Sequence, residues 1–98
     1  MDRGQVIAKL RLYEWELKAA GVVHLRVFGS VARGESTAAS DVDLIADLDY
    51  EREFSLLDMS GLEMRLSDIL DAKVDLTPSR SMKPRIRERA DKEAVVAF

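Results

Sequence analysis

The sequence contains no cysteine, and this absence narrows the chemistry that the chain can perform. Without thiols there is no disulfide, no cysteine nucleophile, no iron–sulfur cluster and no cysteine-based zinc site. The single histidine, His24, cannot by itself build a histidine-ligated metal site. A metal ion in this protein is therefore expected to be a hard cation bound by carboxylates.

Long apolar segments are also missing. No run approaches the roughly 20 apolar residues of a membrane-spanning helix or the core of a signal peptide. The composition, 47% hydrophobic and 34% charged, is typical of a globular protein, and 98 residues leave room for one domain. We expect a single domain over residues 1–98, located in the cytoplasm and without membrane contact.

Charge is distributed unevenly around a formal net charge of −3. Residues 1–40 carry six basic and four acidic side chains, residues 41–75 three and eleven, and residues 76–98 six and three. No broad basic face is indicated, which argues against direct binding of nucleic acid. The acidic middle segment is either a solvated surface or a cation site, depending on where its carboxylates point.

Hydrophobic periodicity predicts helices that alternate with three strands. An amphipathic helix is expected over residues 3–20 and strands over 22–28, 42–48 and 73–77, with a short helical turn at 31–33 and a loop at 35–40. A further helix is expected to start at Ser55, and a last one at Pro84 with Ser81 as its cap, extending to about residue 95. This order predicts an α/β (α+β) fold, a small mixed β-sheet with helices packed on it.

Gly29 and Ser30 stand where the first predicted strand meets the helical turn. Glycine lets a ligand approach the backbone closely, and a serine hydroxyl adds a hydrogen-bond donor, so the pair suits a phosphate group. An ordinary turn has the same composition, and this motif alone does not decide between the two.

Asp41 and Asp43 are two residues apart at the start of the second predicted strand, so their carboxylates point to the same face. Two like charges side by side repel each other unless a cation lies between them. A pair of Mg²⁺ ions bridged by such carboxylates suits phosphoryl or nucleotidyl transfer. The alternative is an acidic strand edge that discourages aggregation.

Asp75 interrupts the apolar third strand, where aspartate is disfavoured. It either faces solvent or meets Asp41 and Asp43 across neighbouring strands. Trp15 and the apolar tail are candidate partner contacts, although ordinary core packing is the favoured interpretation for Trp15.

Taken together, these motifs resemble a known family. The segments FGSVARGE (28–35), SDVDLI (40–45) and KVDL (73–76), and the tail 83–95, are similar to the minimal nucleotidyltransferases (MNT) of the DNA polymerase β superfamily. The resemblance covers the chain from about residue 5 to its end. It departs from the family pattern at Glu35, where aspartate is typical.

The resemblance implies roles for individual residues. Asp41, Asp43 and Asp75 would be the catalytic carboxylates and the ligands of two Mg²⁺ ions. Gly29 and Ser30 would bind the β- and γ-phosphates of ATP. Arg33 lies inside the matched motif, and whether it contacts phosphate or braces the loop stays open.

The resemblance also implies a function. Members of this family are typically antitoxins that transfer AMP from ATP to a tyrosine of a HEPN-domain ribonuclease toxin. The alternatives are an antitoxin that acts by binding alone, and a transferase for a small molecule such as an aminoglycoside, completed by a partner chain. Because 98 residues leave little beyond a catalytic core, a protein acceptor and a homodimer or hetero-oligomer are expected.

Overall fold

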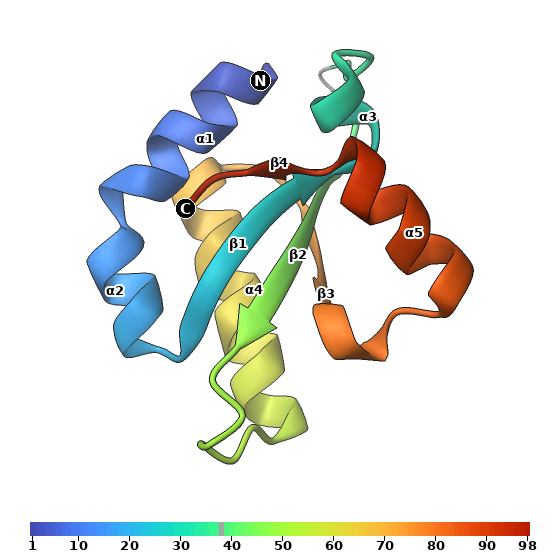
Figure 1. Ribbon diagram of the computed structural model, residues 1–98. Coiled ribbons are helices and arrows are strands. Elements are labelled where there is room, and N and C mark those ends of the chain that lie inside the picture. Colours follow the sequence, from blue (N-terminus) through green and yellow to red (C-terminus); the bar gives the residue numbers. More distant parts are fainter. Residues whose placement is uncertain (38) are drawn as a thin grey trace.

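A four-stranded mixed sheet forms the centre of the protein (Figure 1). The computed structural model describes residues 1–37 and 39–98. The strands β1 (Val22–Phe28), β2 (Val42–Leu48), β3 (Val74–Pro78) and β4 (Val95–Val96) are arranged in the order β3-β2-β1-β4. β2 and β3 are parallel, whereas β1 is antiparallel to both β2 and β4. The expected fold class, a small mixed sheet with helices, is confirmed.

Three helices cover one face of the sheet: α1 (Arg3–Leu12), α2 (Glu14–Ala19) and α4 (Leu56–Leu70). The main core lies between these helices and the strands. Its largest fully buried side chains belong to residues from both layers: Val6, Leu10, Leu17, Val22, Leu25, Val27, Val31, Leu44, Leu66 and Leu70. Burial of this apolar surface is the main force that holds the helical layer on the sheet.

The other face is covered by α5 (Pro84–Glu93) and the short helix η1 (Ser79–Ser81). A small second core of Ile45, Met82 and Ala90, with Phe28 packed against it, lies on this side. Because side chains alternate along a strand, Asp43 points to the same face as Ile45, while Leu44 points into the main core. The acidic residues of β2 therefore lie on the face that α5 only partly covers.

The first predicted helix is divided at Tyr13, which the sequence pattern did not predict. Tyr13 has a non-helical backbone conformation (φ −107°, ψ 15°), and α2 begins at the next residue. The break leaves Leu17 fully buried but Trp15 90% exposed. The interpretation of Trp15 as a core residue is therefore wrong.

Capping explains where two of the helices begin. The Ser55 side chain accepts a hydrogen bond from the Asp58 amide, and the Asp58 side chain accepts one from the Ser55 amide. This capping box satisfies two amides at the start of α4 and confirms the predicted boundary. Asp2 and Gln5 form a second capping box before α1, which the sequence analysis did not identify.

Boundaries near the end of the chain differ from the expectation. Ser81 does not cap α5, because it belongs to η1, and Lys83 occupies the cap position instead. The helix ends at Glu93, because Val95 and Val96 pair with β1 as β4. β3 is shifted by one residue and includes Pro78, which an edge strand tolerates.

The expected loop over 35–40 is free of helix and strand at its described positions, and residue 38 lies outside the described part of the chain. None of the helices within residues 1–37 and 39–98 has the length and apolar character required to cross a membrane.

Candidate active site

The Gly29–Ser30 turn connects β1 directly to the short helix α3 (Gly29–Arg33). Gly29 has a φ of +72°, a backbone conformation that residues with a side chain rarely adopt. A Cβ at this position would overlap the Asp43 carboxylate. Glycine therefore allows the turn and the Asp43 carboxylate of β2 to come into close contact. The helical turn begins at Gly29, two residues earlier than predicted.

The end of α3 is fixed by its own backbone. The Ser30 carbonyl accepts hydrogen bonds from the amides of Gly34 and Glu35, and Gly34 takes the left-handed conformation (φ +74°) that commonly ends a helix. These hydrogen bonds fix the backbone of Ser30 between β1 and the loop that leads to β2. The Ser30 side chain is half-buried.

Asp43 and Asp75 occupy matching positions on neighbouring parallel strands. Their flanking residues on each strand point into the core, so both carboxylates lie on the face toward α5. Asp43 is half-buried and Asp75 is exposed. The sheet thus brings together two of the three predicted carboxylates, which are far apart in the sequence.

The electrostatics of this pair are unfavourable without a counter-charge. Burial raises the pKa of Asp43 above its ordinary value, and the negative charges of Asp75 and then Asp41 raise it further. The Arg33 guanidinium acts in the opposite direction and lowers the pKa of Asp43. The charges of both other predicted carboxylates and of one basic side chain therefore act on the pKa of Asp43.

Asp41 forms an ion pair with a basic residue. Its carboxylate lies 3.7 Å from the Lys73 ammonium, just before β3. Within residues 1–37 and 39–98, no three His, Cys, Asp or Glu side chains form a ready metal-binding group. Both partners of the Asp41–Lys73 ion pair are well exposed, so the pair contributes little to stability and is easily exchanged. Carboxylate oxygens are suitable ligands for a divalent cation, and Asp43 and Asp75 already lie opposite each other.

Arg33 braces the turn in this structure. Its Nε donates a hydrogen bond of 3.0 Å to Glu35, and its Nη1 lies 3.8 Å from Glu93 at the end of α5. Glu93 did not emerge from the sequence as a functional residue. No local motif marks it, since it lies in a charged helix and 60 positions after Arg33.

A pocket of about 230 Å³ opens beside Asp43. Its other lining residues come from β1, β2, β3, η1's end and α5: Phe28, Leu44, Ile45, Thr77, Met82 and Ile86. It is an apolar recess with one carboxylate at its edge. No sequence motif marks Thr77, Met82 or Ile86 as site residues, because the three come together only through the packing of α5 on the sheet.

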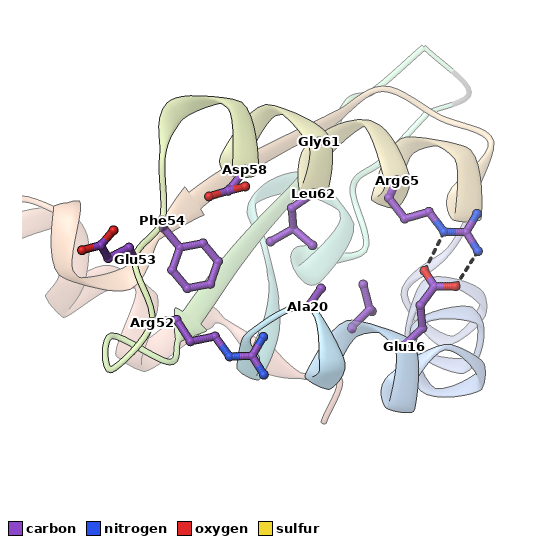
Figure 2. A pocket seen from close by; sticks show the side chains of 10 residues that line it. Glu16, Ala20, Arg52, Glu53, Phe54, Asp58, Gly61, Leu62 and Arg65 are labelled. Atoms are coloured by element: carbon purple, nitrogen blue, oxygen red, sulfur yellow. Dashed lines mark hydrogen bonds and ion pairs between the residues drawn. The ribbon is translucent and has the colours of Figure 1, made fainter.

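A separate pocket of about 340 Å³ lies between α2 and α4 (Figure 2). The Arg65 guanidinium donates two hydrogen bonds to Glu16 at one end, and Phe54 and Arg52 lie at the other. None of the predicted site residues lines this pocket.

The comparisons with known proteins agree with this architecture. The chain belongs to the nucleotidyltransferase domain family, whose model matches residues 10–97. It is 38% identical over 88 residues to a Methanocaldococcus jannaschii protein assigned as a protein adenylyltransferase, covering 88% of each chain. It is 40% identical over 75 residues to the protein adenylyltransferase MntA of Thermococcus cleftensis, covering 76% of this chain and 74% of that protein.

Solved structures show the same fold. A minimal nucleotidyltransferase matches with a TM-score of 0.81 at 37% identity, covering 97% of this chain and 95% of that chain. A toxin–antitoxin complex with AMP-PNP contains a chain that matches with a TM-score of 0.71 at 19% identity, covering 100% of this chain and 73% of that chain. The expectation that this chain is a nucleotidyltransferase of the minimal type is confirmed.

Proposed function

We propose that this nucleotidyltransferase transfers AMP from ATP to a tyrosine hydroxyl of a cognate HEPN-domain ribonuclease toxin and thereby acts as its antitoxin. The single observation that carries the proposal is the pairing of Asp43 with Asp75 beside the Gly29–Ser30 turn. In this arrangement, carboxylates that can bind cations lie beside a glycine-containing turn that a triphosphate can approach closely.

In this proposal Asp41, Asp43 and Asp75 hold two Mg²⁺ ions. Bound Mg²⁺ supplies positive charge that neutralises the triphosphate and favours ionisation of the attacking hydroxyl. For Asp41 to take part, its carboxylate leaves Lys73, an exchange that the exposure of both side chains permits. Burial, and then the charges of Asp75 and Asp41, raise the pKa of Asp43, and a nearby cation offsets both effects because it favours the ionised carboxylate.

The remaining residues bind and orient the nucleotide. Gly29 and Ser30 contact the β- and γ-phosphates, and Arg33 adds positive charge at the end of the same turn. The acceptor oxygen forms a bond to the α-phosphorus of ATP, the bond from that phosphorus to the β-phosphate bridge breaks, and pyrophosphate leaves. In this proposal Asp75, which is the more exposed of the paired carboxylates, accepts the proton of the acceptor hydroxyl.

Support for a protein acceptor comes from the relatives. The two relatives described above carry the name protein adenylyltransferase, and one solved neighbour contains a tri-AMPylated HEPN toxin of Shewanella oneidensis with an MNT antitoxin. That neighbour is 17% identical, so the likeness itself concerns the fold alone.

Intact-mass measurement of the cognate HEPN protein tests the proposal. Incubation with this protein, ATP and Mg²⁺ is expected to increase the mass of the HEPN protein by one or more AMP units, and omission of Mg²⁺ is expected to prevent it. Neutralisation of the toxin without a mass change would instead indicate an antitoxin that acts by binding alone. Modification of an aminoglycoside in the absence of any HEPN protein would indicate a small-molecule transferase.

A further inference from the structure

Arg33 is held between two carboxylates that come from different parts of the chain. Glu35 follows it in the loop and accepts a hydrogen bond from its Nε, while Glu93 approaches its Nη1 from the end of α5. The distance of 3.8 Å between Arg33 Nη1 and Glu93 Oε2 is short enough for an ion pair but too long for a hydrogen bond. The Nη groups of Arg33 therefore keep donors for another anionic partner.

Glu93 is unusual among the acidic residues of α5. Its Oε2 atom is buried and accepts no hydrogen bond within the described part of the chain. The cations near this atom are Arg33 at 3.8 Å and Arg89 at 3.9 Å. A buried carboxylate oxygen is costly unless charge compensates it, so Glu93 favours conformations in which Arg33 stays close.

The backbone of Glu93 is well anchored. The amide of the next residue, Ala94, donates a hydrogen bond to the Ala90 carbonyl inside α5, and β4 then pairs with β1. Glu93 is therefore fixed relative to β1, and β1 leads directly into the Gly29–Ser30 turn. The ion pair ties the guanidinium of Arg33 to the framework that also carries this turn.

The charge of Arg33 acts on Asp43 as well as on Glu93. Arg33 ends helix α3, whose first residue, Gly29, abuts the Asp43 carboxylate, and the positive charge of Arg33 lowers the pKa of Asp43. A guanidinium near both the turn and Asp43 is suited to bind a phosphate oxygen of a nucleoside triphosphate through two donors.

We propose that Glu93 is a positioning residue for nucleotide binding, which acts by holding Arg33 where its free donors meet the triphosphate. This inference rests on the proposed function, because it requires that ATP bind at the Gly29–Ser30 turn. Glu93 itself does not contact the nucleotide. Its contribution is to keep the long Arg33 side chain from adopting other conformations, which reduces the entropy lost on binding.

A double-mutant cycle on ATP affinity tests this role. The dissociation constant of ATP in the presence of Mg²⁺ is measured by titration calorimetry, without any acceptor, for the unaltered protein, Glu93→Gln, Arg33→Ala and the double variant. Glu93→Gln keeps the size of the side chain and removes its charge. We expect it to weaken ATP binding about tenfold, the scale of one charged hydrogen bond. In the Arg33→Ala background it is expected to have no further effect.

Glu88→Gln is the matched control. Glu88 belongs to the same helix, is exposed and pairs only with Lys92 among the described ion pairs, at 3.7 Å. This variant is expected to bind ATP with unchanged affinity. If Glu93→Gln does not fold, as judged by its circular dichroism, Glu93→Ala, which also removes the charge, replaces it in the same cycle.

The results separate the inference from the function on which it rests. If Glu93→Gln binds ATP as tightly as the unaltered protein, or weakens binding equally with and without Arg33, the positioning role is wrong while the proposed function stands. If the unaltered protein itself does not bind ATP, the proposed function fails, and the role of Glu93 fails with it.

Discussion

Asp43 and Asp75 lie directly opposite each other on adjacent parallel strands, on the face of the sheet that α5 partly covers. Neighbouring strands are about 4.8 Å apart, so two ionised carboxylates at matching positions repel each other. Asp43 is in addition half-buried beside the Gly29–Ser30 turn. Repulsion between the two carboxylates therefore destabilises the folded protein at the position of the proposed cation site.

Removing the charge of Asp43 is expected to preserve or increase stability when no divalent cation is present. Asp43→Asn keeps the shape of the side chain and relieves repulsion worth roughly 0.2–1 kcal/mol. The free energy of unfolding, measured by urea denaturation in EDTA at neutral pH, is expected to be at least that of the unaltered protein. A clear loss of stability would contradict this electrostatic description.

The difference in the free energy of unfolding between Asp43→Asn and the unaltered protein is expected to depend on pH. The pKa of Asp43 is raised in the folded protein, so the folded state binds the proton more readily than the unfolded chain. The stability of the unaltered protein therefore falls as pH rises from the ordinary aspartate pKa through the raised value, whereas Asp43→Asn lacks this contribution. Urea titrations across this range in EDTA are expected to show the difference growing with pH. A constant difference would contradict the raised pKa.

Gly29 and Gly34 offer a matched pair for testing the turn. Both have a positive φ, but a Cβ on Gly29 would overlap the Asp43 carboxylate, whereas a Cβ on Gly34 meets no atom within 4 Å. Gly34→Ala is expected to cost only the backbone strain, about 1–2 kcal/mol. Gly29→Ala is expected to cost more and to displace Asp43, which thermal unfolding and ATP titration measure. Equal effects of the two substitutions would show that the close contact does not matter.

Glu63 protects the open edge of the sheet. Its side chain accepts a hydrogen bond of 3.0 Å from the Leu76 amide of β3, and the Ser67 hydroxyl accepts one from Val74. Glu63→Ala leaves the Leu76 amide without this partner and is expected to reduce the free energy of unfolding by about 1 kcal/mol. Glu63→Gln retains an acceptor oxygen and is expected to be nearly neutral in the same urea titration. A neutral alanine variant would contradict this role.

Trp15 is expected to contribute almost nothing to the stability of the isolated protein. Its side chain is 90% exposed, so Trp15→Ala is expected to change the free energy of unfolding by less than about 0.5 kcal/mol. Leu17→Ala, which removes a fully buried side chain from the same helix, is expected to cost about 2–5 kcal/mol. Similar losses for both variants would contradict the placement of Trp15.

The three longer strands and the start of α4 were predictable because their signals are local. β-branched residues mark β1 and β2, and the spacing of Ser55 and Asp58 marks a helix start. The break at Tyr13 was not predictable from periodicity, since the apolar spacing continues across it. β4 was missed because two residues give no periodic pattern, and only pairing with β1 defines them as a strand.

The candidate site was predictable in part. The sequence predicts that Asp41 and Asp43 share a face, as two such positions of one strand do. In the structure β2 begins at Val42, and the Asp41 carboxylate pairs with Lys73. The sequence does not determine that β3 lies next to β2, which places Asp75 opposite Asp43. The contact between Arg33 and Glu93, and the turn of Asp41 toward Lys73, depend on packing between distant segments and carry no local signal.

Transfer of label from α-labelled ATP to the HEPN protein is measured for the unaltered protein and for Asp43→Asn. We expect the unaltered protein to label the HEPN protein when Mg²⁺ is present, and we expect Asp43→Asn, although folded, not to do so. Undiminished labelling by Asp43→Asn would show that the carboxylates paired across β2 and β3 are not the reaction centre.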